Sequence, residues 1–104
     1  MTAFPDRETA FENKFAHDEE LKFRVNARRD KLTGLWAAAL LGKSGDEAAA
    51  YATSVVAADM EEAGDEDVVR KLSTDLGALA DDQTIRAKLA EMLTEAKRQI
   101  MSEE

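Results

Sequence analysis

Apolar residues recur every three or four positions along most of this chain, which is the period of an α-helix with one buried face. No stretch of useful length alternates with a period of two, so no β-sheet is expected. The helical period is clearest near the C-terminal end, where its members are Ile85, Leu89, Met92, Leu93, Ala96 and Ile100.

Three short segments rich in glycine or aspartate interrupt this pattern, at residues 42–46, 64–65 and 80–84, and they predict four helices. The first helix is expected over about residues 6–41. Asp46 and Asp65 are candidate N-caps for the second and third helices. Short connections favour antiparallel neighbours, so the predicted fold is all-α: a four-helix bundle with a long first helix whose N-terminal part is mobile or projecting. The predicted core consists of Leu32, Leu35, Trp36, Leu40, Tyr51, Val55, Val56, Val68, Leu72, Leu76, Leu89, Leu93 and Ile100, with Val69 and Leu79 also facing inward.

The first predicted helix changes character along its length. All four phenylalanines of the chain lie in residues 4–23. On a helical wheel Phe4, Phe11 and Phe15 form a narrow stripe flanked by charges, whereas Phe23 lies off it. A helix of this length would extend beyond three shorter neighbours. Two interpretations remain open: residues 1–18 are a flexible, intrinsically disordered segment that becomes helical in a partner's groove, or the stripe folds back onto the bundle of residues 19–104.

Composition and charge narrow the functional classes. A length of 104 residues fits one domain, and the formal net charge of −8 argues against nucleic acid or acidic lipid as a partner. The charge is uneven: residues 1–30 hold seven acids and six bases, or −1, which leaves −7 for the remainder. No signal peptide and no apolar run of about 20 residues is visible, so the expectation is a cytoplasmic protein without direct membrane insertion.

Side chains suited to catalysis are scarce. The chain has no cysteine and a single histidine, His17, and the acidic run at residues 59–67 lacks the spacing of a calcium-binding loop. No catalytic residue, metal site or enzymatic activity is therefore predicted. The one basic cluster, Arg24, Arg28, Arg29 and Lys31, either grips an acidic partner or a nucleotide phosphate, or pairs with nearby acids.

These observations leave two hypotheses of different classes. In one, the chain is an interaction protein whose N-terminal helix binds and regulates a larger target. In the alternative, it is a small helical ligand-binding regulatory protein for adenine nucleotide or a metal.

Several short motifs resemble those of the zeta-subunit family, the small inhibitors of the F-type ATP synthase of alpha-proteobacteria. They are DRETAFE at residues 6–12, KFAHDEEL at 14–21, ARR at 27–29 and GLWAA at 34–38, with further matches up to residue 68. The resemblance is weak in the last helix. Three positions depart from the family pattern: Thr9 stands where lysine is frequent, Asp30 where asparagine is usual, and Met60 where phenylalanine is common. Of these, only Thr9 removes a charge from the inhibitory segment.

The resemblance implies an inhibitor of ATP hydrolysis whose N-terminal helix inserts at a catalytic α/β interface beside the rotating γ subunit. It implies a monomer when free, peripheral to the inner membrane through the ATP synthase. No cofactor is expected, although some relatives are suspected of binding adenine nucleotide, for which Arg24, Arg28 and Arg29 are the candidates. The partner-binding candidates, from the stripe and the resemblance together, are Phe4, Arg7, Phe11, Glu12, Lys14, Phe15, Asp18 and Glu19.

Overall fold

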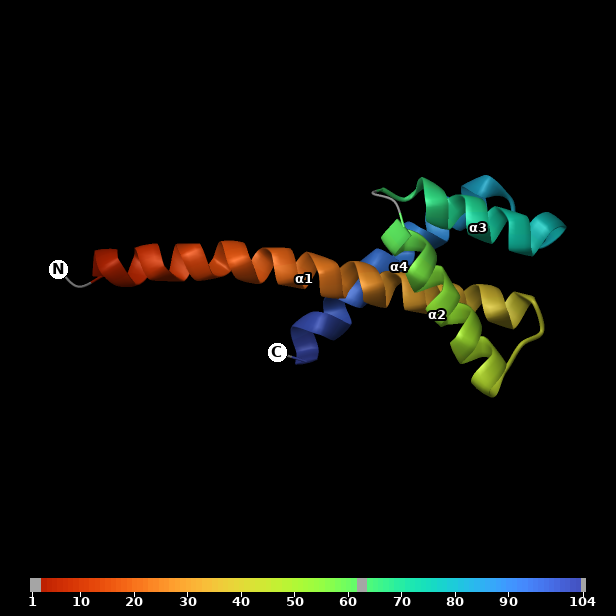
Figure 1. Ribbon diagram of the computed structural model, residues 1–104, viewed down its shortest axis with the longest axis horizontal. Coiled ribbons are helices and arrows are strands. Elements are labelled where there is room, and N and C mark those ends of the chain that lie inside the picture. The colour runs from red at the N-terminus through yellow and green to blue at the C-terminus, as the bar shows by residue number, and fades with distance from the viewer. Residues whose placement is uncertain (1–2, 62–63, 104) are drawn as a thin grey trace.

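A computed structural model describes residues 3–61 and 64–103 of the chain, and the side chains of residues 19–60 and 64–103. The described residues form four α-helices, a 3-10 turn and no strand (Figure 1). The predicted all-α fold with a long first helix is confirmed. The side chains of residues 1–18 of the chain are not among those described. The elements are α1 (Ala3–Leu40), α2 (Gly45–Glu61), α3 (Glu66–Leu76), η1 (Gly77–Leu79) and α4 (Asp82–Glu103).

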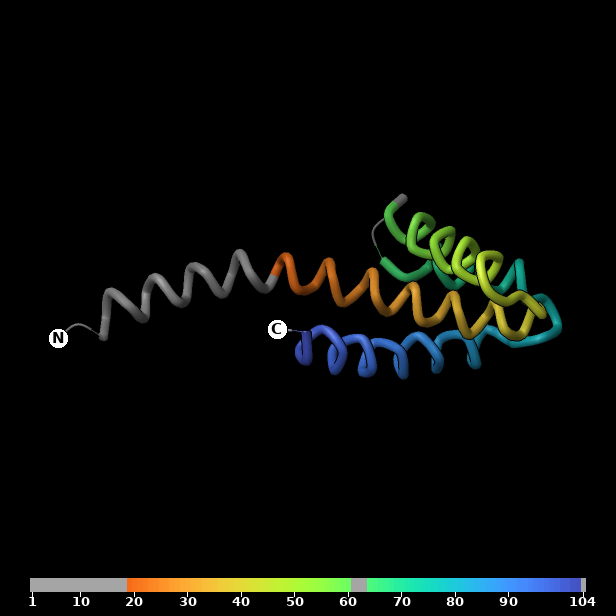
Figure 2. Tube along the Cα trace, turned by 90° about the horizontal axis from the view of Figure 1, so that it is seen from below, coloured from red at the N-terminus to blue at the C-terminus, as the bar shows by residue number. Residues whose placement is uncertain are grey.

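Helices α1 and α4 run antiparallel along the second half of α1 (Figure 2). Two contacts fix this direction: Glu103, at the end of α4, pairs with Arg28, whereas Lys88, near its start, lies over the ring of Trp36. Helix α2 crosses α1 on another side, and α3 packs against the other three helices (Figure 1). The second half of α1 is therefore the central element of the bundle.

The buried face of α1 is built from small and polar residues rather than large aliphatic ones. It keeps the i, i+3, i+4 spacing through Arg29, Asp30, Thr33, Gly34, Ala37 and Ala38. The prediction that Leu35 and Leu40 are core residues is wrong, because their side chains are 36% and 40% exposed. Leu32 and Trp36 are half-buried at the edge of this face.

Close approach of α1 and α2 explains why this face is small. A Cβ atom added at Gly34 would lie 2.7 Å from the Cα of Ala52 and 3.2 Å from a methyl carbon of Val55. The nearer distance is shorter than any ordinary carbon–carbon contact, so glycine lets the two backbones meet. Leucine at this position would push the helices apart.

We expect Gly34→Ala to lower the free energy of unfolding by about 1–3 kcal/mol, because the added methyl group overpacks the α1–α2 contact. Alanine is the better helix former by about 1 kcal/mol, so the expected sign is opposite to that of helix propensity. Urea denaturation followed by circular dichroism measures the change. The matched control is Thr53→Ala on the exposed side of α2, which is expected to be close to neutral. A Gly34→Ala protein more stable than wild type would show that the contact relaxes freely.

The hydrophobic core lies where α2, α3 and α4 meet α1. Its buried members include Ala37, Val55, Val68, Val69, Leu72, Leu76, Ile85 and Leu89. The predictions for Val55, Val68, Leu72, Leu76, Leu89 and Ile100 are confirmed. Tyr51 and Leu93 are half-buried, as is Val56.

The sequence-based placement of Leu79 is wrong, since its side chain is 55% exposed. Helix α3 ends at Leu76, and Gly77 takes a positive φ of 54°, so the following 3-10 turn no longer continues the helical face. Glycine adopts a positive φ without steric cost, and it frequently follows the last turn of a helix.

The helix starts use aspartate in different ways. Asp46 lies in the first turn of α2 rather than at its N-cap, because the helix already begins at Gly45. Asp81 does cap α4: its Oδ1 accepts a hydrogen bond of 2.7 Å from the backbone N–H of Thr84. Asp65 occupies the N-cap position of α3 but makes no side-chain capping bond. Its carboxylate is directed to α1 instead.

Candidate functional site

The predicted partner-binding residues lie almost entirely outside the described side chains. The members whose side chains are not described are Phe4, Arg7, Phe11, Glu12, Lys14, Phe15 and Asp18. Glu19 is the one described member, and it is exposed on α1. The helix itself is continuous from Ala3 to Leu40, so the segment that carries the phenylalanine stripe and the buried half of α1 share one backbone.

Two of the predicted basic residues, Arg24 and Arg28, point toward the end of α4. Arg28 donates a hydrogen bond of 2.7 Å to Oε1 of Gln99, and its Nη2 lies 2.8 Å from Oε1 of Glu103. Arg24 Nη2 lies 3.7 Å from the other oxygen of Glu103. These contacts tie the C-terminal turn of α4 to α1, and each guanidinium is already engaged by a carboxylate.

Arg29 points in another direction, into the bundle, and is only 5% exposed. Its Nε and Nη2 donate to Oδ1 of Asp30 at 3.1 and 2.8 Å, and its Nη1 donates to Oδ1 of Asp65 at 3.0 Å. The carboxylate of Asp59 completes the group, 3.6 Å from Nη2. Burial alone would lower the pKa of Arg29, but Asp30 and Asp65 raise it above its usual value, so the guanidinium stays charged.

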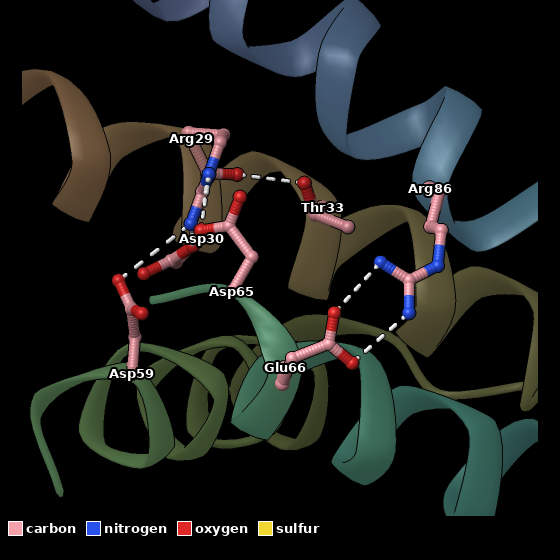
Figure 3. A network of polar contacts seen from close by, with 7 residues as sticks. All are labelled: Arg29, Asp30, Thr33, Asp59, Asp65, Glu66 and Arg86. Carbon is pink, nitrogen blue, oxygen red and sulfur yellow. Dashed lines mark hydrogen bonds and ion pairs between the residues drawn. The ribbon is translucent and has the colours of Figure 1, made fainter. Parts of the chain in front are cut away.

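This group, which we call the Arg29 cluster, consists of Arg29, Asp30, Asp59 and Asp65 (Figure 3). It joins α1 to the end of α2 and to the start of α3. On the same face of α1, the buried hydroxyl of Thr33 donates a hydrogen bond of 2.8 Å to the backbone carbonyl of Arg29, so this hydroxyl also has a partner. Buried ionic groups hold a specific geometry only when several partners are in place, as they are around Arg29.

A second ion pair lies beside the Arg29 cluster. Arg86 of α4 donates from Nη1 and Nη2 to the two carboxylate oxygens of Glu66 on α3, each at 3.0 Å, and from Nε to Asp82 at 2.9 Å (Figure 3). The pair is exposed, so its contribution to the free energy of unfolding is small. Its bidentate geometry nevertheless orients α3 relative to α4.

An apolar groove lies between α1 and α4, on the turns of α1 that directly follow residues 1–18. It encloses about 330 Å³ and is lined by Leu21, Lys22, Val25, Asn26, Leu93, Lys97, Ile100 and Met101. No group of three or more His, Cys, Asp or Glu side chains placed to hold a metal occurs within the described part of the chain. None of the described helices is long and apolar enough to cross a membrane.

Sequence reasoning grouped Arg24, Arg28 and Arg29, but the structure divides them between two sites. It considered the acidic run at residues 59–67 as a calcium-binding loop and Asp65 as an N-cap, and so missed the Arg29 cluster. A signal was available: Arg29 and Thr33 are spaced i and i+4 in line with Ala37, so two polar residues occupy the face that becomes buried.

The fold and these contacts define a small all-α bundle whose first helix continues past it toward the N-terminus. Comparison with known proteins identifies the family. The family model described as ATPase inhibitor subunit zeta matches residues 1–99, so the chain belongs to the ATPase inhibitor subunit zeta family. No curated protein matches the chain. A solved structure, a solution NMR structure of a protein 52% identical in sequence, matches with a TM-score of 0.75 and covers 81% of this chain and 99% of its own.

Proposed function

We propose that this protein inhibits ATP hydrolysis by the F-type ATP synthase, and that the first half of α1 does so by inserting at a catalytic α/β interface beside the rotor. The observation that carries the proposal is the family match, which starts at residue 1 and therefore includes the whole phenylalanine stripe. The family is that of an ATPase inhibitor subunit. The predicted contacts to the α, β and γ subunits are the finer part of the proposal.

The proposed mechanism is steric and needs no chemistry from the inhibitor. Phe4, Phe11 and Phe15 would be the apolar anchors, because large aromatic side chains dominate the energy of helix-in-groove binding. The surrounding charges, Arg7, Glu12, Lys14, Asp18 and Glu19, would set orientation and encounter rate. A helix lodged beside the rotor stops rotation in the hydrolysis direction. Rotation in the synthesis direction would open the interface and release it.

In this proposal residues 1–18 bind the enzyme and residues 19–104 hold the helix in place. The described contacts support such a division. Helix α1 is anchored from Arg24 onward by Glu103 at the end of α4, and one face of it is buried by its neighbours from Arg29 to Ala38. The protein would be a monomer when free and peripheral to the membrane through the enzyme that it inhibits.

The nucleotide-binding alternative is not proposed, since no described contact favours it. Arg28 and Arg29 donate to side chains of the bundle itself, and Arg24 lies within ion-pair distance of Glu103. A phosphate would have to compete with a carboxylate at each of these guanidinium groups.

The test is to add purified protein to F-type ATP synthase that lacks its own inhibitor, and to measure hydrolysis and synthesis in the same preparation. We expect hydrolysis to fall in a saturable manner and synthesis to fall much less, because the helix is released by rotation in that direction. Equal loss of both activities would contradict the one-way mechanism. Unchanged hydrolysis at saturating protein would contradict inhibition itself.

A further inference from the structure

One oxygen of a fully buried carboxyl group has no hydrogen-bond donor in the described structure. Asp30 is 0% exposed, and its Oδ1 accepts both hydrogen bonds from Arg29. Its Oδ2 is buried and accepts none. An ionised carboxylate oxygen without a donor is costly in the interior of a protein, because it loses its water and gains nothing in return.

The charges around Asp30 further destabilise the ionised form of its carboxyl group. Arg29 on α1 is the only cation in the Arg29 cluster, whereas Asp59 comes from α2 and Asp65 from the connection before α3. Ionising all three carboxyls around one guanidinium would leave the cluster with a charge of −2. From α3 and α4 the nearby charged groups are Glu66, Arg86 and Asp82, which are bound to one another.

Figure 3 shows the carboxyl group of Asp30 beside that of Asp59, on the same side of Arg29. Two carboxyl groups can lie together in an apolar setting if one of them carries a proton and donates it to the other. That arrangement would supply the donor that Oδ2 of Asp30 lacks. It would also reduce the charge of the cluster to −1.

We infer that Asp30 and Asp59 form a proton-binding site, in which Oδ2–H of Asp30 donates a hydrogen bond to the carboxylate of Asp59. The proton comes from solvent and returns to solvent as Asp30 titrates, and no other group changes. Since the site joins α1 to the end of α2, loss of the proton places two negative charges against each other at that junction.

The pKa of Asp30 agrees with this geometry. Burial is the largest cause, the hydrogen bond to Asp59 acts in the same direction and Arg29 acts against both; together they raise the pKa of Asp30 to about 8. The folded pKa is thus above the value of about 3.9 expected in the unfolded chain. The contribution of protonated Asp30 to the stability of the folded state is complete below the unfolded pKa. It declines as the pH rises between the two pKa values and is lost above about 8.

Two measurements on the full-length protein test the site. In ¹³C NMR, the carboxyl carbon of Asp30 is expected to titrate with a pKa of about 8. In urea denaturation, the unfolding equilibrium constant is expected to rise by up to about tenfold per pH unit between pH 6 and 8.

Asp30→Asn is the informative variant, because its amide can donate to Asp59 at every pH while its oxygen still accepts from Arg29. It is expected to remove the high titration and to reduce the pH dependence of unfolding by about one proton relative to wild type. Asp59→Asn, a second variant in case the first fails to fold, is expected to move the titration of Asp30 toward the ordinary carboxyl range. Asp81→Asn, exposed and outside the cluster, controls for a general loss of charge and is expected to leave the high titration unchanged. Titration of the wild-type Asp30 carboxyl below pH 6, or the same pH dependence of unfolding in Asp30→Asn, would overturn the inference.

Discussion

Replacing Phe11 and Phe15 together by alanine is expected to weaken inhibition of ATP hydrolysis by two to three orders of magnitude. Truncating an aromatic anchor at the centre of an interface costs roughly 2 kcal/mol or more, and each 1.4 kcal/mol is a factor of about ten in affinity. The two residues are spaced i and i+4 on α1, so both belong to one binding face. The measurement is the inhibitor concentration that halves hydrolysis.

The matched control for this experiment is Phe23→Ala. Phe23 lies on the same helix and is 60% exposed, but it is off the stripe, so its loss is expected to change the inhibitory concentration little. Circular dichroism of all variants verifies that the bundle is intact. Full inhibition by the double variant, or equal loss in Phe23→Ala, would show that the stripe is not the anchor.

Leu72→Ala is expected to produce the largest loss of stability, about 3 kcal/mol within the range of 2–5 seen for buried leucines. Leu72 is fully buried on α3 within the core, so its truncation leaves a cavity that close-packed neighbours cannot fill. Urea denaturation at constant pH gives the free energy of unfolding for the variant and for wild type.

Leu79→Ala provides a control of identical chemistry only seven positions away. Its side chain is more than half exposed, so the expected cost is below 1 kcal/mol. Similar losses in the two variants would mean that the 3-10 turn at residues 77–79 packs more tightly than its exposure indicates.

The sequence predicts the helices because their period is repeated over many residues, but it does not show where a face stops. Leu72 and Leu79 belong to one apparent series with Leu76, and only the backbone of Gly77 separates the buried members from the exposed one. A glycine can end a helix or continue it, and the choice depends on what the next turn packs against. For this reason the helix count was predictable and the fate of Leu79 was not.

The face of α1 was predicted less well for a different reason. Large aliphatic residues such as Leu35 and Leu40 carry the strongest hydrophobic signal, yet the backbones of α1 and α2 meet at Gly34. Small residues favour burial only when the partner is also small, and that partner, Ala52, lies on another helix. The Arg29 cluster likewise depends on carboxylates from three separate segments, which no local pattern brings together.

The contact between Trp36 and Lys88 gives the protein an internal optical probe. Trp36 is the only tryptophan of the chain, half-buried at the contact between α1 and α4, and the ammonium group of Lys88 lies 5.5 Å from its ring centre. Its emission reports on the bundle and is insensitive to events confined to residues 1–18, which contain no indole. A binding partner that changes the emission wavelength has therefore altered the surroundings of Trp36, whereas one that leaves it constant has left those surroundings unchanged.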